Sequence, residues 1–415
     1  MNRESKYFVF EREIPLGKTL AVLLAFLITA VNFGNLMTDI RNAPEVVYAE
    51  TESELSDKLA LGFSDHGLSI TAERSSDQKL NPREVSLRYN GIISLRKIAA
   101  CVEPRRSLVP GGQAVGISIY TDGVLVVGLS GFRSAEGISV DPAQKAGLKA
   151  GDVILAVNGE SVSTADELRT LLASSSGSIR LLVDRAGSVF ESVLTPEKSE
   201  TGELRIGAWV RDSTVGVGTL TYYDPSDLTM AALGHAVTDA DTGSLLKVKD
   251  GKLVIADIIG VTKGRAGAPG ELHGTFSDGS YPLGEIDLNT ELGIFGKLFP
   301  DAPRFLGGEA LEVAFPDEVH TGDAYIITSA GGDLSIRSCR IIRTGKQNGP
   351  APKGLVIEIT DEALIGITGG IVQGMSGSPV IQDGRLVGVI THVLVNDPTK
   401  GYGAYAYWMF KRNGG

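Results

Sequence analysis

The sequence predicts a mainly β protein built from more than one domain. Its 415 residues exceed what a single hydrophobic core usually serves. There are 52 glycines against 17 prolines, which indicates many tight turns between short strands. Past Pro196, short β-branched runs such as LVIADIIGV, GLVIEIT and RLVGVITHV alternate with glycine turns, a spacing typical of a barrel or sandwich. Between two such runs, Asp383-Gly384 predicts a two-residue hairpin.

Composition narrows the classes of function and partner. The formal charge of -11 comes without any long run of lysine or arginine, so no nucleic-acid partner is expected. Cys101 and Cys339 are too few for a disulfide framework and too isolated for a metal-ligand cluster, and whether they pair stays open. We expect neither a metal nor an organic cofactor.

The first residues have the pattern of a targeting segment. Residues 1–18 carry four basic residues, and 19–33 form an uncharged, almost wholly apolar run. That run is shorter than the ~20 residues that comfortably span a bilayer, which fits a signal peptide or a short signal anchor. Because Val47-Tyr48-Ala49 lies well past it as a cleavage site, we expect an uncleaved membrane anchor at 19–33, a short cytoplasmic segment at 1–18, and export of the rest.

A compact α+β module is predicted at 106–197, after a charged linker and N-terminal region at 34–105. The runs VGISIY, GVLVVGL and IRLLVDR indicate strands. ADELRTLLAS, residues 165–174, has helical spacing with Thr164 as N-cap. PAQKAGLKAGDVILAVNGESV, from Pro142, resembles a PDZ domain, which implies a peptide ligand bound by strand addition next to a glycine-containing loop. We place that loop in PGGQAVGI, at Gly116 and Ile117.

The chemistry is concentrated in GGIVQGMSGSPVIQ, residues 369–382, which resembles the nucleophile loop of chymotrypsin-like peptidases. Ser376 is the expected nucleophile, and the backbone N–H groups of Gly374 and Ser376 are the expected oxyanion hole. Ser378 is expected to be structural. The hydrolase signature G-x-S-x-G fails because Ser378 stands where it needs glycine, and strand rather than helix follows, so an α/β-hydrolase is excluded.

The general base is expected at His235. Of the five histidines, it alone ends a frame, TLTYYDPSDLTMAALGH, that resembles the strand pair presenting the histidine in double-barrel peptidases. It also precedes Ser376, the order that this fold requires. His392 and Asn396, beyond the serine, are candidates for the specificity pocket, although a structural role is favoured for both.

The carboxylate that would orient His235 is not fixed by spacing alone. Asp287 lies 52 residues after His235, close to the usual chymotrypsin spacing, whereas Asp361 lies 15 residues before Ser376. Asp239 and Asp241 are closer in sequence but are expected to be solvated turn residues.

These features together resemble the stage IV sporulation protein B family across nearly the whole chain. The resemblance rests on the anchor, the PDZ module, AALGH, GIVQGMSGSP and the tail THVLVNDPTKGYGAYAYWM. It implies a serine endopeptidase with a chymotrypsin-like double barrel at 198–415, and an aspartate fifteen residues before the serine, which favours Asp361 over Asp287.

The resemblance also implies where the protein acts. The expected location is the space between the forespore and mother-cell membranes of a sporulating bacterium. The expected substrates are the chain itself and a membrane-bound regulator of an intramembrane protease that processes a late sigma factor.

Two alternative functions remain. One is a quality-control protease of the HtrA kind, in which the PDZ domain follows the catalytic domain. The other is a noncatalytic PDZ scaffold. Because Met375 replaces the aspartate that activates digestive zymogens, we expect the PDZ domain to regulate the enzyme by holding the chain's own N-terminal segment for cleavage.

Overall fold

The computed structural model describes residues 45–61, 68–71, 83–89, 93–276, 281–347 and 349–412. The chain divides into two compact units, 1–104 and 105–415. The described residues of the first unit, expected to be a linker, form a four-stranded sheet in the order β1-β4-β3-β2 and the helix α2. Their bounds are β1 Val46–Ala49, α2 Glu52–Leu61, β2 Leu68–Thr71, β3 Arg83–Tyr89 and β4 Ile93–Val102.

The second unit begins with a six-stranded barrel. Its strands are β6 Ala114–Leu129, β15 Ala208–Tyr223, β16 Thr229–Ala232, β17 Val248–Ile255, β20 Pro282–Thr290 and β21 Gly293–Leu298. Pairing runs β6-β17-β20-β21-β16-β15, and β15 pairs with β6 to close the ring. Its core includes Ile119, Leu220, Leu253 and Ile294. Around the barrel lie β5 Ser107–Pro110, β18 Asp257–Thr262, β19 Glu271–Thr275, α5 Pro303–Leu306 and β22 Leu311–Glu312.

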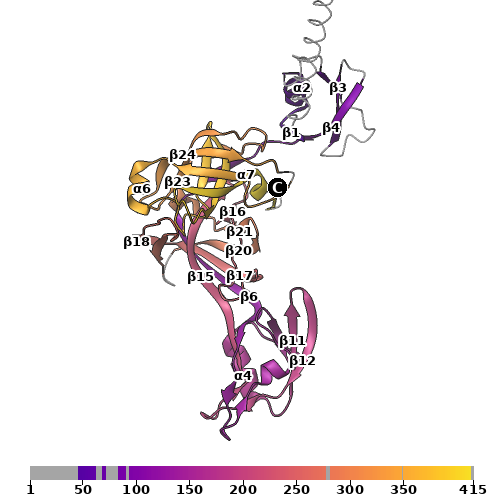
Figure 1. Cartoon of the computed structure of the whole chain (residues 1–415), viewed down its shortest axis with the longest axis vertical. Helices are drawn as coiled ribbons and strands as arrows, with labels where there is room; N and C mark the ends of the chain where they lie inside the picture. Colours follow the sequence, from indigo (N-terminus) through magenta and orange to yellow (C-terminus); the bar gives the residue numbers. More distant parts are fainter. Residues whose placement is uncertain are drawn as a thin grey trace, which may run out of the picture. The chain divides into compact units, whose positions relative to one another are not determined.

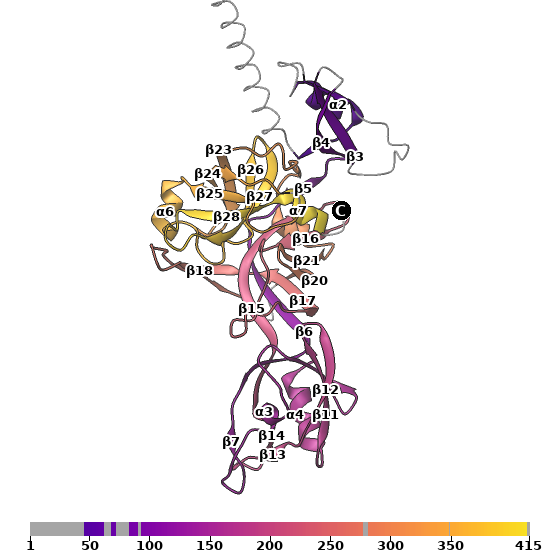
Figure 2. The same cartoon turned by 45° about the vertical axis from the view of Figure 1, so that its right-hand side comes forward.

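The PDZ module is an insertion between the first two strands of this barrel and does not precede the peptidase domain. Strands β6 and β15 are each 16 residues long. They pair along their length, from Ala114 opposite Thr219 at one end to Leu129 opposite Ala208 at the other. They therefore run continuously from the barrel into the PDZ module (Figures 1 and 2). The expected boundary near residue 197 is wrong because VGISIY and GVLVVGL, predicted as two strands of one module, form the single strand β6, whose first half pairs within the barrel and whose second half pairs within the PDZ module.

Within the PDZ module, the predicted helix and its N-cap are confirmed. The helix over 165–174 is present, and Thr164 caps it in a reciprocal capping box with Glu167. Asn158 and Gly159 both have positive φ between β9 and β10. The elements are β7 Phe132–Arg133, β8 Ser139–Val140, α3 Pro142–Lys145, β9 Val153–Val157, β10 Glu160–Ser161, α4 Ala165–Ser174, β11 Ile179–Arg185, β12 Ser188–Leu194, β13 Glu197–Lys198 and β14 Leu204–Arg205.

A second closed barrel completes the unit, with the order β23-β24-β25-β28-β27-β26. The elements are β23 Gly322–Thr328, β24 Ser335–Thr344, β25 Leu355–Ile359, α6 Glu362–Thr368, β26 Pro379–Gln382, β27 Arg385–Val393, β28 Lys400–Tyr405 and α7 Ala406–Arg412. The hairpin predicted at Asp383-Gly384 joins β26 to β27, with both residues at positive φ. The buried, free thiol of Cys339 belongs to this barrel's core.

The expected membrane anchor at 19–33 and the cytoplasmic segment at 1–18 lie outside the described residues. Among the residues that are described, no helix is both long enough and apolar enough to cross a bilayer.

Candidate active site

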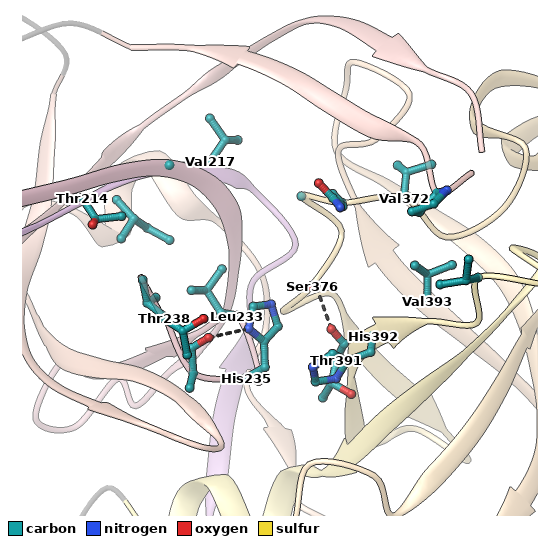
Figure 3. Close-up of a pocket in the computed structure, with 18 residues that line it drawn as sticks. Thr214, Val217, Leu233, His235, Thr238, Val372, Ser376, Thr391, His392 and Val393 are labelled. Carbon is teal, nitrogen blue, oxygen red and sulfur yellow. Dashed lines mark hydrogen bonds between the residues drawn. The ribbon is translucent and has the colours of Figure 1, made fainter. Parts of the chain in front are cut away.

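A pocket of about 480 Å³ brings His235 and Ser376 together, lined by residues of both barrels. Leu233, His235 and Thr238 come from the segment after β16, and Ser376, Thr391 and His392 come from the nucleophile loop and β27 (Figure 3). Volumes of this order are typical of ligand pockets. The two residues expected to be nucleophile and base therefore share one cleft, as the double-barrel arrangement requires.

His235 is held in the tautomer that a general base needs. Its Nδ1 lies 2.8 Å from the carbonyl oxygen of Ala236, and because a carbonyl only accepts, Nδ1 carries the proton. Nε2 is then the unprotonated nitrogen. Burial lowers the pKa of His235 below its ordinary value, and the bond to Ala236 opposes this shift. The imidazole is therefore neutral at physiological pH.

Ser376 lies at the turn between α6 and β26. Its hydroxyl donates to the Thr391 carbonyl at 2.8 Å, and not to His235. The Ser376 hydroxyl must turn away from this carbonyl before His235 can accept its proton. Hydrogen bonds between a nucleophile and its base often form only when substrate is bound.

The orientation of each expected oxyanion donor is fixed by the hydrogen bond that the carbonyl of the same peptide unit accepts. In a trans peptide the C=O and the following N–H point in opposite directions. The Gln373 carbonyl accepts from the Leu272 N–H at 2.9 Å, and the Met375 carbonyl accepts from the Ser378 N–H at 3.0 Å. The N–H groups that follow them, those of Gly374 and Ser376, have no acceptor among the described residues. Both donors are thus free to receive a negatively charged oxygen.

Two glycines make this loop possible. Gly374 and Gly377 have φ of +95° and +103°, a region that side chains rarely adopt. A Cβ on Gly377 would also lie 2.2 Å from the Thr219 carbonyl oxygen. The glycines of QGMSGS are therefore required by backbone geometry and close packing, whatever the chemistry.

Asp361 is not the partner of His235 in this structure. It is the N-cap of α6, where its Oδ1 accepts the Leu364 N–H at 2.7 Å and lies 3.6 Å from Arg337 Nη1. In the part of the chain that is described, no carboxylate bonds to the His235 ring. Where the sequence predicts an orienting carboxylate, the structure places the carbonyl of Ala236 at the His235 ring.

The other candidate carboxylates also make no bond to the His235 ring within the described structure. Asp287 lies on the exposed face of β20. The buried side chain of Asn289, two residues on, bonds both the N–H and the carbonyl of Val237 and so braces the segment that carries His235. Asp239, expected to be solvated, is buried and pairs with Arg211.

Asp361→Asn is expected to leave kcat within about 3-fold of wild type, because asparagine caps a helix as well as aspartate. Asp361→Ala should lower the free energy of unfolding by about 1 kcal/mol through loss of the cap. Steady-state kinetics and urea unfolding of both variants measure this. A fall in kcat of about 10⁴-fold in the asparagine variant, with stability unchanged, would instead make Asp361 a triad member.

Gly116 and Ile117 do not form a carboxylate-binding loop. Both lie inside β6, where Gly116 pairs with Val217 and Val254. A Cβ at Gly116 would lie 2.5 Å from the Phe276 ring, so close packing accounts for the glycine. Ile117 lines the pocket that contains Ser376. Both residues therefore belong to the first barrel, because the PDZ module begins farther along the same strand.

His392, for which a structural role was favoured, lies in the pocket with its ring 5.1 Å from that of His235. Burial, followed by the charges of His235 and Lys353, lowers its pKa to about 4. A neutral imidazole therefore lines the cleft beside the serine. The sequence signal was its position sixteen residues after Ser376, at the end of β27.

Comparison with known proteins identifies the family of this chain. The protein-family model described as SpoIVB peptidase S55 matches residues 202–410, half of the chain. The chain belongs to the SpoIVB peptidase S55 family. It is a serine peptidase, and the resemblance to stage IV sporulation protein B found in the sequence is confirmed. A second model, described as PDZ domain, matches residues 140–185.

Solved structures similar to this SpoIVB-type peptidase include two proteases at low identity. The active form of the Rv3671c protease from M. tuberculosis is 16% identical, with 48% of this chain and 72% of that chain covered and a TM-score of 0.27. The HtrA-type protease AlgW with decapeptide is 12% identical, with 49% and 53% covered and a TM-score of 0.27. No curated protein is matched by the sequence.

Proposed function

We propose that this peptidase is a signalling endopeptidase of sporulation that cleaves itself and then a membrane-bound regulator of an intramembrane protease. Its proposed site of action is the space between the forespore and mother-cell membranes. The observation that carries the proposal is the SpoIVB peptidase match over 202–410, which contains both His235 and Ser376. The shared cleft and the two free N–H groups of the nucleophile loop support it.

In the proposed acylation step, Ser376 Oγ attacks the scissile carbonyl while its proton passes to His235 Nε2. The carbonyl oxygen becomes an oxyanion that the N–H groups of Gly374 and Ser376 receive. When the C–N bond breaks, the proton on Nε2 goes to the leaving amine. Water then repeats the sequence on the acyl group, releasing the acid and restoring the serine.

An extended peptide fits the strand edge beside Ser376. Strand β26 pairs with β27 only as far as Val389, whereas β28 pairs with it to Val393. The Ile390 carbonyl and N–H still bond the Gly377 N–H and the Ser378 carbonyl. Beyond Ile390, β27 has no strand partner on the Ser376 side among the described residues, and its Thr391 carbonyl accepts the serine hydroxyl. A substrate backbone that adds as a strand here is held by main-chain bonds.

Regulation by the PDZ module is supported by its contacts with the segment that follows His235. Arg211, in the part of β15 that pairs with Leu125, forms ion pairs with Asp239 and Asp241. Lys247, just before β17, pairs with Asp184 of β11 at 2.5 Å. The loop that carries the proposed base is therefore braced against the PDZ module.

The proposed function is tested by giving the purified enzyme two substrates, its own full-length Ser376→Ala chain and unfolded casein. We expect a few defined fragments from the chain and little hydrolysis of casein. Broad casein degradation without defined fragments would favour an HtrA-like quality-control protease.

A variant that joins Tyr120 to Ser213 through Asn-Gly removes the PDZ module at a directly paired position of β6 and β15.

We expect that variant to lose self-cleavage while a fluorophosphonate still labels Ser376. Self-cleavage at the wild-type rate would contradict the regulatory role. A larger deletion that began at residue 108 would remove β6, so its loss of activity would not report on the PDZ module.

A further inference from the structure

We propose that Thr219 is a positioning residue for the oxyanion hole, acting through the carbonyl of Gly374. This inference rests on the proposed roles of Ser376 and Gly374. Thr219 belongs to β15 of the first barrel, and its Oγ1 donates to the Gly374 carbonyl at 2.7 Å. A side chain of one barrel thus holds a carbonyl in the nucleophile loop of the other.

The Gly374–Met375 peptide lies between the two peptide units whose N–H groups form the proposed hole. Its N–H, that of Met375, donates to the Val372 carbonyl at 3.1 Å, and its carbonyl accepts from Thr219. Glycine at 374 removes the steric barrier that would otherwise keep this peptide plane from turning. The hydrogen bond from the Thr219 hydroxyl is therefore one of two that fix the orientation of the Gly374–Met375 peptide.

The orientation matters because the hole receives negative charge. If the Gly374 carbonyl turned toward the cleft, its oxygen would stand beside the developing oxyanion and repel it. Donors that are fixed before the reaction stabilise the oxyanion without reorganising, and this preorganisation is usually the largest electrostatic contribution to catalysis. Holding the Gly374 carbonyl away from the cleft keeps that contribution.

Thr219 has little freedom to move. Its side chain is buried, with 2% of the residue exposed. Its own carbonyl accepts the Leu233 N–H at 3.2 Å, two residues before His235, and lies against Gly377. The same residue thus contacts the segments of both the proposed base and the proposed nucleophile, which makes its hydroxyl a rigid donor.

Thr219→Val tests the proposal, because valine keeps the shape of the side chain and removes the donor. Thr221→Val is the matched control, since Thr221 is buried two residues along the same strand and its Oγ1 has no partner among the described residues. Thr219→Ser keeps the hydroxyl and is the rescue variant. Each full-length protein is assayed for kcat and KM on a peptide substrate.

We expect Thr219→Val to lower kcat about 10²-fold, at the lower end of the loss for removing an oxyanion donor itself, with KM changed less than about 3-fold. Thr219→Ser and Thr221→Val should stay within about 3-fold of wild type. A peptide boronate, which bonds Ser376 Oγ to give a tetrahedral anion, should bind Thr219→Val more weakly by the same factor. Binding of the product peptide should not change.

Wild-type kcat in Thr219→Val, or an equal loss in Thr221→Val, would overturn the positioning role. In both cases the wild type would still be active, so the proposed function would stand. A wild type that neither hydrolyses peptide nor binds the boronate would instead contradict the proposed function and this inference with it.

Discussion

Replacing Ser376 with alanine is expected to lower kcat about 10⁶-fold and to remove every self-cleavage fragment. Among the residues of the nucleophile loop that line the cleft, Ser376 alone carries a hydroxyl. It shares this cleft with His235 and with the free N–H groups of Gly374 and Ser376. Fragments are followed by mass spectrometry of the full-length chain expressed in a bacterial host.

Ser378→Ala is the matched control for this prediction. Ser378 is buried two residues on, and its Oγ has no hydrogen-bond partner within the described structure, while its backbone bond to Met375 survives the change. We expect its activity to stay within a few-fold of wild type. If the Ser376→Ala fragments equalled those of wild type, host enzymes would be the source of cleavage.

Replacing His235 with alanine is expected to cost as much as replacing Ser376, because a serine without its base is a poor nucleophile. The double variant should be no worse than either single variant, since the two residues act as one unit. His320→Ala is the control, because His320 is exposed and pairs with Asp383. Additive losses in the double variant would show that His235 does not act through Ser376.

The pH profile of the wild type should report the same histidine. Only the neutral imidazole accepts a proton, and burial lowers the pKa of His235, so kcat/KM should be full near pH 7 and fall below pH 6.5. His392, with its pKa at about 4, stays neutral through this fall, so His392→Gln should retain the profile. A fall centred above pH 6.5 would contradict a buried His235 as the base.

Local rules were enough to predict one hairpin turn and one helix cap of this chain. Asp383-Gly384 and Thr164 satisfy requirements of φ and of helix N-termini that depend on a few neighbouring residues. The same rule applied at Asp361 would have found its role: an aspartate three residues before Leu364, at the start of EALIGIT, is an N-cap signal.

What the sequence did not reveal depends on pairing between distant strands. The insertion of the PDZ module is visible only when Ala114 is seen to pair with Thr219 across the whole module. Thr219 itself carries no signal, because its bond to Gly374 spans 155 residues. The Ser376 and His235 frames were readable because each is a local motif, but their meeting in one cleft comes from the packing of two barrels.

The most direct test of the central claim is to label the wild-type protein with a fluorophosphonate and locate the adduct by peptide mapping. Phosphorus accepts the oxygen of an activated serine and fluoride leaves, so reaction marks a nucleophile with a working base. We expect a single adduct on Ser376, absent in His235→Ala and undiminished in Asp361→Asn. An adduct on another residue, or equal labelling of Ser376 in His235→Ala, would contradict it.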